Sequence, residues 1–226
     1  MWQALRTELQ PLGVEVVTVA LDVDPEAARR FIERAEPEHP SLIDRAHLVD
    51  ELFGISNVPN SVWIDEEGVI VRPVEVSNVQ KSAIASGKID PKSLPPKLRK
   101  LITGIKYDHE AYIAALRDWA LKGAKSTWAL EPHEVIARST PRSAETARAA
   151  AHFELGEHLH RLGEVEAAQR HWREAHRLAP ENWTYKRQAW QLVDPGAQGP
   201  TAVYDGSWVE DVAAIGAENY YKPLSP

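Results

Sequence analysis

The sequence predicts an α/β fold for its N-terminal half and an all-α region for its C-terminal half. Three patterns support this prediction. The run VEVVTVAL at residues 14–21 is apolar and β-branched, which is typical of a strand buried on both faces. Two strand-like runs at 62–65 and 69–76 flank a Glu-Glu-Gly turn, which predicts a β-hairpin. Residues 143–179 carry small and large apolar residues at the spacing of a helix pair.

Local signals place the remaining elements of the N-terminal half. Residues 2–10 have the pattern of the end of an amphipathic helix, which a Pro-x-Gly sequence stops. Asp24 is suited to cap a helix that begins at Pro25 and runs to about residue 35. Residues 41–44 form a short extended segment, and a second helix follows at about 45–53. Strands alternating with helices imply a layered α/β sheet.

Charge and hydropathy exclude two classes of partner. The chain has 226 residues and a net charge of −7, and residues 1–90 hold 16 acidic against 8 basic side chains. Nucleic-acid binding needs a positive surface, so that half is unsuited to it. No run approaches the roughly 18 apolar residues of a membrane helix, and the N-terminus lacks the layout of a signal peptide. We therefore expect a cytoplasmic protein that binds neither nucleic acid nor membrane.

The sequence contains no cysteine, and its single methionine is residue 1. It therefore has no disulfide, thiolate zinc site, iron–sulfur cluster or thiol nucleophile. No phosphate-binding loop, dinucleotide glycine pattern or serine elbow is present. The five histidines of residues 152–176 include no i,i+4 pair and no His-Glu-x-x-His motif. We expect no catalytic residue, no metal and no cofactor.

The segment GISNVPNSVWIDEEG at residues 54–68 resembles the redoxin type of thioredoxin-fold domain, which includes the extracytoplasmic thiol-disulfide oxidoreductases. The resemblance extends over residues 1–76 and implies a thioredoxin-like fold with thiol–disulfide or peroxide chemistry. It also implies that Pro59 is a cis-proline facing the active site. Val58 and Asn60 would then offer backbone groups to an extended partner chain, as in strand addition. A trans proline that opens a strand is the alternative.

The resemblance also implies a redox motif that this sequence lacks. In that family a strand and a Cys-x-x-Cys precede the helix whose end residues 2–10 resemble, because a helix N-terminus lowers the pKa of a thiol. We therefore expect an N-terminally truncated domain that is inactive as this chain. One explanation is a start upstream of Met1, with a cysteine or selenocysteine motif there. The other is a degenerate domain whose strands at 14–21 and 62–65 pair directly or recruit another segment.

The C-terminal half resembles the tetratricopeptide repeat in one copy. Small residues in this repeat let two antiparallel helices approach, and large residues fill the groove between them. Counted from Ala149 as position one, positions 7, 8, 15, 20, 24, 27 and 32 are Leu155, Gly156, Gly163, Ala168, Trp172, Ala175 and Pro180. A helix at 181–193 would cap the repeat.

The repeat implies a concave surface for partner binding. Its residues would be Ala150, Phe153, Glu157, His160 and Arg161. The alternative is a helical cap that packs on the α/β domain.

The expected domains are a thioredoxin-like domain at 1–80, a linker at 81–107, a helical region at 108–195 and a tail at 196–226 that packs on them. The helical region begins with helices at about 108–122 and 126–138. The expected function is that of a redoxin-like protein that is inactive as this chain. The alternative is a non-catalytic interaction module that binds a protein or peptide through its helical region.

Overall fold

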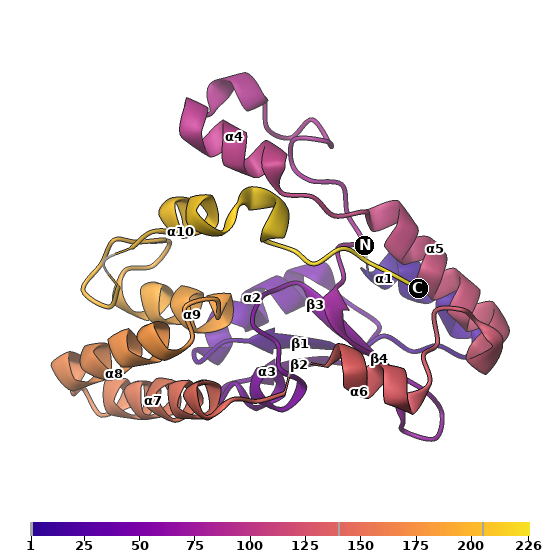
Figure 1. The fold of residues 1–226 in the computed structure, drawn as a ribbon, viewed down its shortest axis with the longest axis horizontal. Helices are drawn as coiled ribbons and strands as arrows, with labels where there is room; N and C mark the ends of the chain where they lie inside the picture. Colours follow the sequence, from indigo (N-terminus) through magenta and orange to yellow (C-terminus); the bar gives the residue numbers. More distant parts are fainter. Residues whose placement is uncertain (1, 140, 205) are drawn as a thin grey trace. The chain divides into compact units, whose positions relative to one another are not determined.

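The computed structural model describes residues 2–139, 141–204 and 206–226 (Figure 1). The chain divides into two compact units. Unit 1 consists of Met1–Val16, Pro59–Ser139 and Trp208–Pro226, and unit 2 of Val17–Val58 and Thr140–Ser207. Each unit draws on both halves of the sequence, so the units do not coincide with the segments 1–80, 81–107, 108–195 and 196–226. The fold class is mixed α/β with a larger helical part, as predicted.

The α/β part of unit 2 is a strand–helix–strand element. Strand β1 (Thr18–Leu21) pairs in parallel with β2 (Ser41–Asp44), and helix α2 (Pro25–Ala35) connects them. The side chain of Asp24 accepts a hydrogen bond from the amide of Glu26, which confirms the predicted cap of α2. Helix α3 (Leu48–Phe53) follows and ends at Gly54 in the left-handed conformation.

Strand β1 differs from the prediction in length and burial. It is four residues long, against the eight of the predicted run 14–21, and all four are only partly buried. A strand is buried on both faces when other strands and helices cover it, and β1 has one neighbouring strand in the described residues.

The helical part of unit 2 is an antiparallel pair followed by a third helix. Helices α7 (Ala144–Arg161), α8 (Val165–Leu178) and α9 (Trp183–Val193) lie side by side (Figure 1) and match the predicted positions. Gly156 of α7 faces the indole of Trp172, and a Cβ on Gly156 would lie 2.6 Å from it. Ala168, Trp172 and Ala175 are fully buried. The small alanine side chains allow the close approach of α7 and α8 that the pattern predicted.

Aromatic contacts attach the segment after α9 to the helices. The Lys186 ammonium is buried over the rings of Trp183 and Tyr204, at 4.6 and 4.8 Å from their centroids. Tyr204 also meets the ring of His176 edge-on at 5.2 Å. Burial, together with the charge of Lys186, lowers the pKa of His176 to about 4, so this imidazole is neutral. These contacts position residues 196–204 against α9.

Unit 1 combines a β-hairpin with five helices. Strands β3 (Asn60–Ile64) and β4 (Ile70–Val76) are antiparallel, with a turn at Gly68 as predicted. The helices are α1 (Trp2–Leu9), α4 (Pro96–Gly104), α5 (His109–Lys122), α6 (Pro132–Arg138) and α10 (Trp208–Ile215). Leu5, Leu9, Trp63 and Tyr112 are buried together in its core. Helix α4 falls within the predicted linker 81–107.

Tyr112 connects the hairpin to α5. Its hydroxyl accepts a hydrogen bond from the indole of Trp63 at 3.1 Å and also bonds the hydroxyl of Ser61. Burial raises the pKa of Tyr112 to about 12. Trp63 in turn stacks on Trp119 with ring centroids 5.0 Å apart. The hairpin is therefore held by α5 through aromatic packing with its polar atoms satisfied.

Two expectations from the sequence are wrong. The four strands of the described residues form two separate two-stranded sheets, so the segments 14–21 and 62–65 do not pair in one layered sheet. The cis peptide bond recorded in the described part of the chain is Gly199–Pro200, so the Val58–Pro59 bond is trans. Pro59 instead precedes β3, a position that suits a trans proline.

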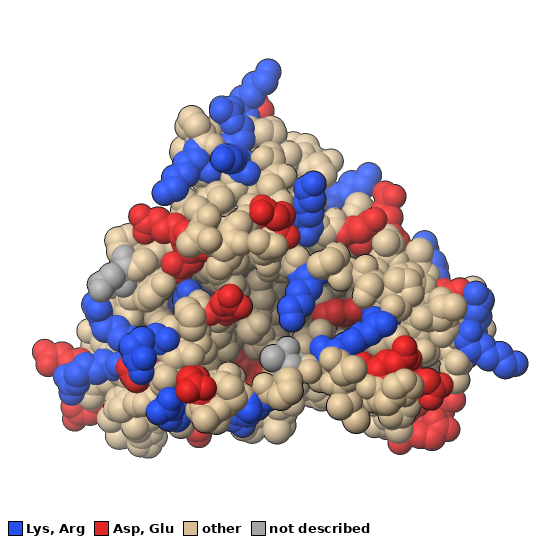
Figure 2. Space-filling view, viewed as in Figure 1, with Lys and Arg blue, Asp and Glu red and all other residues tan. Residues whose placement is uncertain are grey.

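The end of the chain packs on unit 1. Leu224 lies against the core of unit 1, and Arg138 of α6 donates to the carbonyl oxygen of Pro226 at 2.7 Å. Lys and Arg side chains gather over α4 in Figure 2, where the sequence from 91 to 107 has no acidic residue. None of the helices in the described residues is long and apolar enough to cross a membrane.

The substitution Gly156→Ala tests the close approach of α7 and α8. The added methyl group overlaps the buried Trp172, so we expect a loss of about 1–3 kcal/mol in the free energy of unfolding, despite the better helix propensity of alanine. Urea denaturation measures this loss. Adding Trp172→Phe should make the two changes strongly non-additive. Full additivity would contradict the contact.

Candidate functional site

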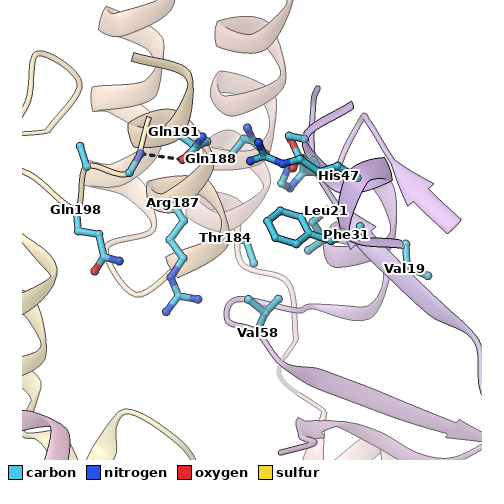
Figure 3. A pocket seen from close by; sticks show the side chains of 16 residues that line it. Val19, Leu21, Phe31, His47, Val58, Thr184, Arg187, Gln188, Gln191 and Gln198 are labelled. Atoms are coloured by element: carbon cyan, nitrogen blue, oxygen red, sulfur yellow. Dashed lines mark hydrogen bonds between the residues drawn. The ribbon is translucent and has the colours of Figure 1, made fainter. Parts of the chain in front are cut away.

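Unit 2 contains a cavity of about 590 Å³, a volume in the range of ligand pockets (Figure 3). Most of the residues that line it belong to β1, α2, α9 and the segment 196–198. The lining residues are Val19, Ala20, Leu21, Asp22, Ala27, Arg30, Phe31, His47, Val58, Thr184, Arg187, Gln188, Gln191, Gly196, Ala197 and Gln198.

One wall of the cavity is the edge of β1 that β2 does not cover. The amide of Thr18 donates to the carbonyl of Pro40, just before β2, at 3.0 Å, and the amide of Asp22 donates to the carbonyl of Asp44 in β2 at 3.3 Å. Successive residues of a strand point their backbone groups to opposite edges, so those of Val19 and Leu21 face away from β2. In the described residues β1 has no other strand partner. The cavity therefore has an open strand edge on one side.

The opposite wall is α9. A side chain of this helix already accepts a hydrogen bond from a backbone amide next to β1, as the backbone of an added strand would. The side-chain oxygen of Gln188 accepts from the amide of Val23 at 3.4 Å, just beyond the end of β1. Arg187 donates to the side chain of Asn57 at 3.2 Å. Figure 3 shows the side chains of Thr184, Arg187 and Gln188 on one side of the cavity and Val19 and Leu21 on the other.

A buried polar cluster adjoins the cavity at His47. The Nδ1 atom of His47 lies 3.1 Å from Oδ2 of Asp50, and the hydroxyl of Thr184 donates to the same oxygen at 2.9 Å. The Nε2 atom of His47 lies 3.8 Å from Oε1 of Glu157. All four side chains are buried. His47 has φ of 54°, an uncommon conformation for a residue other than glycine.

Burial and neighbouring charges set the protonation of this cluster. Burial raises the pKa of Glu157 to about 8, against the opposing effect of His47 and Arg161. Burial alone would lower the pKa of His47, but Asp50 and Glu157 outweigh it and the pKa is raised. The pKa shifts of His47 and Glu157 therefore both favour the protonated forms of these two side chains.

The cluster does not have the geometry of nucleophilic catalysis. A nucleophile–His–Asp relay needs a hydroxyl or thiol at the imidazole nitrogen that the carboxylate leaves open. Here the Thr184 hydroxyl bonds Asp50, while Nε2 of His47 has no hydrogen-bond partner in the described structure. In the described part of the chain, no group of three or more His, Cys, Asp or Glu residues is arranged to hold a metal ion.

The predicted site residues are distributed over both units. Val58 lines the cavity of unit 2, whereas Pro59 and Asn60 belong to unit 1. Of the predicted groove, Phe153 and Glu157 are 2% and 1% exposed. Phe153 stacks on Tyr185 of α9, with centroids 4.2 Å apart. Tyr185 of α9 therefore covers Phe153, while the Glu157 carboxyl is buried beside His47.

Of the other three residues of the predicted groove, Ala150 is buried, and His160 and Arg161 lie near the end of α7. His160 is partly buried, with its ring 5.5 Å from that of Trp172, and Arg161 is exposed. The sequence pattern missed His47, Asp50, Thr184 and Gln188. His47 and Asp50 are three residues apart, but about 130 residues separate them from α9, and no local pattern reveals such a contact.

Comparison with protein-family models, with curated proteins and with solved structures finds no match to this chain. The function is therefore argued from the cavity and its residues.

The substitution Glu157→Gln tests the protonation of the buried cluster. A carboxyl whose folded pKa is raised stabilises the fold below its unfolded pKa of about 4.5, and this stability is lost as pH rises through about 8. His47, whose pKa is also raised, acts in the same direction. We expect the free energy of unfolding to fall by at least about 2 kcal/mol between pH 5 and pH 9.

Glutamine does not titrate, so this pH dependence should be much weaker in the Glu157→Gln variant. Urea denaturation at several pH values gives the measurement. The matched control is Glu145→Gln, an exposed residue of the same helix, which should keep the wild-type pH profile. An unchanged profile in Glu157→Gln would contradict the assigned protonation.

Proposed function

We propose that this protein is a non-catalytic interaction module that binds an extended segment of a protein partner in the cavity of unit 2. The segment adds as a strand to the open edge of β1, with its side chains toward α9. The single observation that supports this most directly is the cavity itself, which has backbone groups of β1 on one wall and polar side chains of α9 on the other.

The charges around the cavity favour a partner segment with an acidic side chain. Arg30, Arg187 and His47 line the cavity, against one carboxyl group, Asp22. Burial raises the pKa of Asp22. An acidic side chain placed among these cations gains attraction and restricts the choice of partner.

The resemblances found in the sequence are consistent with this proposal. In the redoxin family, another strand lies beside the one that corresponds to 14–21, and in our proposal the partner segment takes this position. Helix α9, which follows the tetratricopeptide-like pair, supplies the facing wall. We therefore propose a redoxin-like, thioredoxin-like α/β element joined to a tetratricopeptide-like helical region.

Binding should depend on the outward amides of β1. We would select peptides of about 10 residues, the upper length of a typical strand, from a random library against the full chain and measure their affinities by calorimetry. Val19→Pro removes one outward amide of β1. We expect it to weaken binding by about tenfold, because one backbone hydrogen bond contributes about 1–1.5 kcal/mol.

The matched control is Ile43→Pro, which removes an outward amide on the other edge of the same sheet, in β2. We expect this variant to bind as the wild type does. Equal affinity in wild type and Val19→Pro, or selective loss in Ile43→Pro, would contradict the proposed edge. Circular dichroism establishes that both variants are folded.

The absence of cysteine predicts that this chain does not reduce disulfides. In an insulin-reduction assay with dithiothreitol, the chain should give the same rate as the reductant alone, because no thiolate is present to attack. A clear acceleration by the purified 226-residue chain would contradict the argument from the missing thiol.

A further inference from the structure

Two histidines from different helices meet on the surface of the α7–α8 pair. The Nδ1 atoms of His152 and His171 lie 2.8 Å apart, and their rings stack at an interplanar angle of 29° with centroids 5.1 Å apart. Both side chains are partly exposed, so an ion can reach them from solvent. The two residues are 19 positions apart, and only the packing of the helices brings them together.

The pair lies beside the close approach of α7 to α8. His152 lies one helical turn before Gly156, and His171 directly precedes Trp172. The close approach of Gly156 to Trp172 therefore also sets the separation of the two imidazoles. A preformed pair of ligands loses little conformational freedom when it binds an ion.

We propose that His152 and His171 form a two-nitrogen site for a late first-row divalent metal ion, with water completing the coordination. An ion about 2.0–2.1 Å from each nitrogen would see the two Nδ1 atoms at an angle of about 90°. That angle fits two adjacent positions of a tetragonal or square-planar ion, which Cu²⁺ and Ni²⁺ prefer, better than the tetrahedral geometry of Zn²⁺. The site thus selects Cu²⁺ or Ni²⁺.

The environment of His171 favours the form that binds a metal. Metal ligation needs neutral imidazoles, and burial, together with the neighbouring His152 and Arg170, lowers the pKa of His171. The two Nδ1 atoms lie within hydrogen-bond distance of each other, an arrangement in which one ring carries its proton on Nδ1. Binding through both Nδ1 atoms requires that ring to take the tautomer with its proton on Nε2, a change without net proton loss.

The surrounding charges are mixed. Arg170 lies near His171, while Glu174 lies near His152 and is paired with Arg177. Arg148 also acts on Glu174. The carboxylate of Glu174 offsets part of the cationic repulsion that an incoming divalent ion meets.

The test uses the untagged full chain, because a histidine tag would itself bind these ions. We expect Ni²⁺ to bind by calorimetry and to raise the urea midpoint, since a ligand of the native state stabilises it. Electron paramagnetic resonance of the Cu²⁺ complex should show two nitrogen ligands. Either His152→Ala or His171→Ala should weaken Ni²⁺ binding by at least about tenfold, the lower end of what loss of supporting groups causes in metal sites.

The matched control is His158→Ala, an exposed histidine of the same helix, which should keep the wild-type affinity. Where an alanine variant unfolds, His171→Gln replaces it and gives the same expected loss. The proposal is overturned if Ni²⁺ leaves the wild type unchanged, or if the binding persists in the folded His152 and His171 variants.

Discussion

The contact between Gly156 and the indole of Trp172 is the constraint on which unit 2 depends. It lets α7 and α8 pack with almost no space between them, because a single Cβ on Gly156 would overlap the ring. Phe153 of the same helix pair packs on Tyr185 of α9, and the approach of the two helices brings His152 to His171. Helix α9 can then serve as the wall of the cavity. The absence of a Cβ atom at Gly156 thus allows the helix packing that positions groups of both proposed sites.

The buried cluster of His47, Asp50 and Glu157 shows how polar groups are accommodated in the interior of unit 2. Asp50 receives bonds from His47 and Thr184, which offset the cost of burying its charge. The Glu157 carboxyl avoids the cost of burying a charge because it stays protonated up to about pH 8. The cluster lies where α3, α7 and α9 meet. It therefore specifies how the α/β element and the helices of unit 2 pack, while the adjacent cavity remains available for binding.

The sequence predicted most local structure well because the signals are local. The Asp24-Pro25 cap, the Glu-Glu-Gly turn and the spacing of small residues in 149–175 each act within a few residues. The predicted extent of β1 and the cis bond at Pro59 were wrong. The first had been inferred from the β-branched run 14–21 and the second from the family resemblance, and the described strands form two separate pairs instead of one layered sheet.

By itself, the sequence determined the order of helices and strands, the absence of thiol chemistry and the helix pair with its glycine. Only the tertiary structure decided which surfaces are accessible. Phe153 and Glu157 suit a binding groove in the linear pattern, but Phe153 is buried against Tyr185 of α9 and Glu157 beside His47. His152 and His171, separate in the sequence, become neighbours. Burial and proximity depend on contacts between distant segments, and local periodicity carries no information about those contacts.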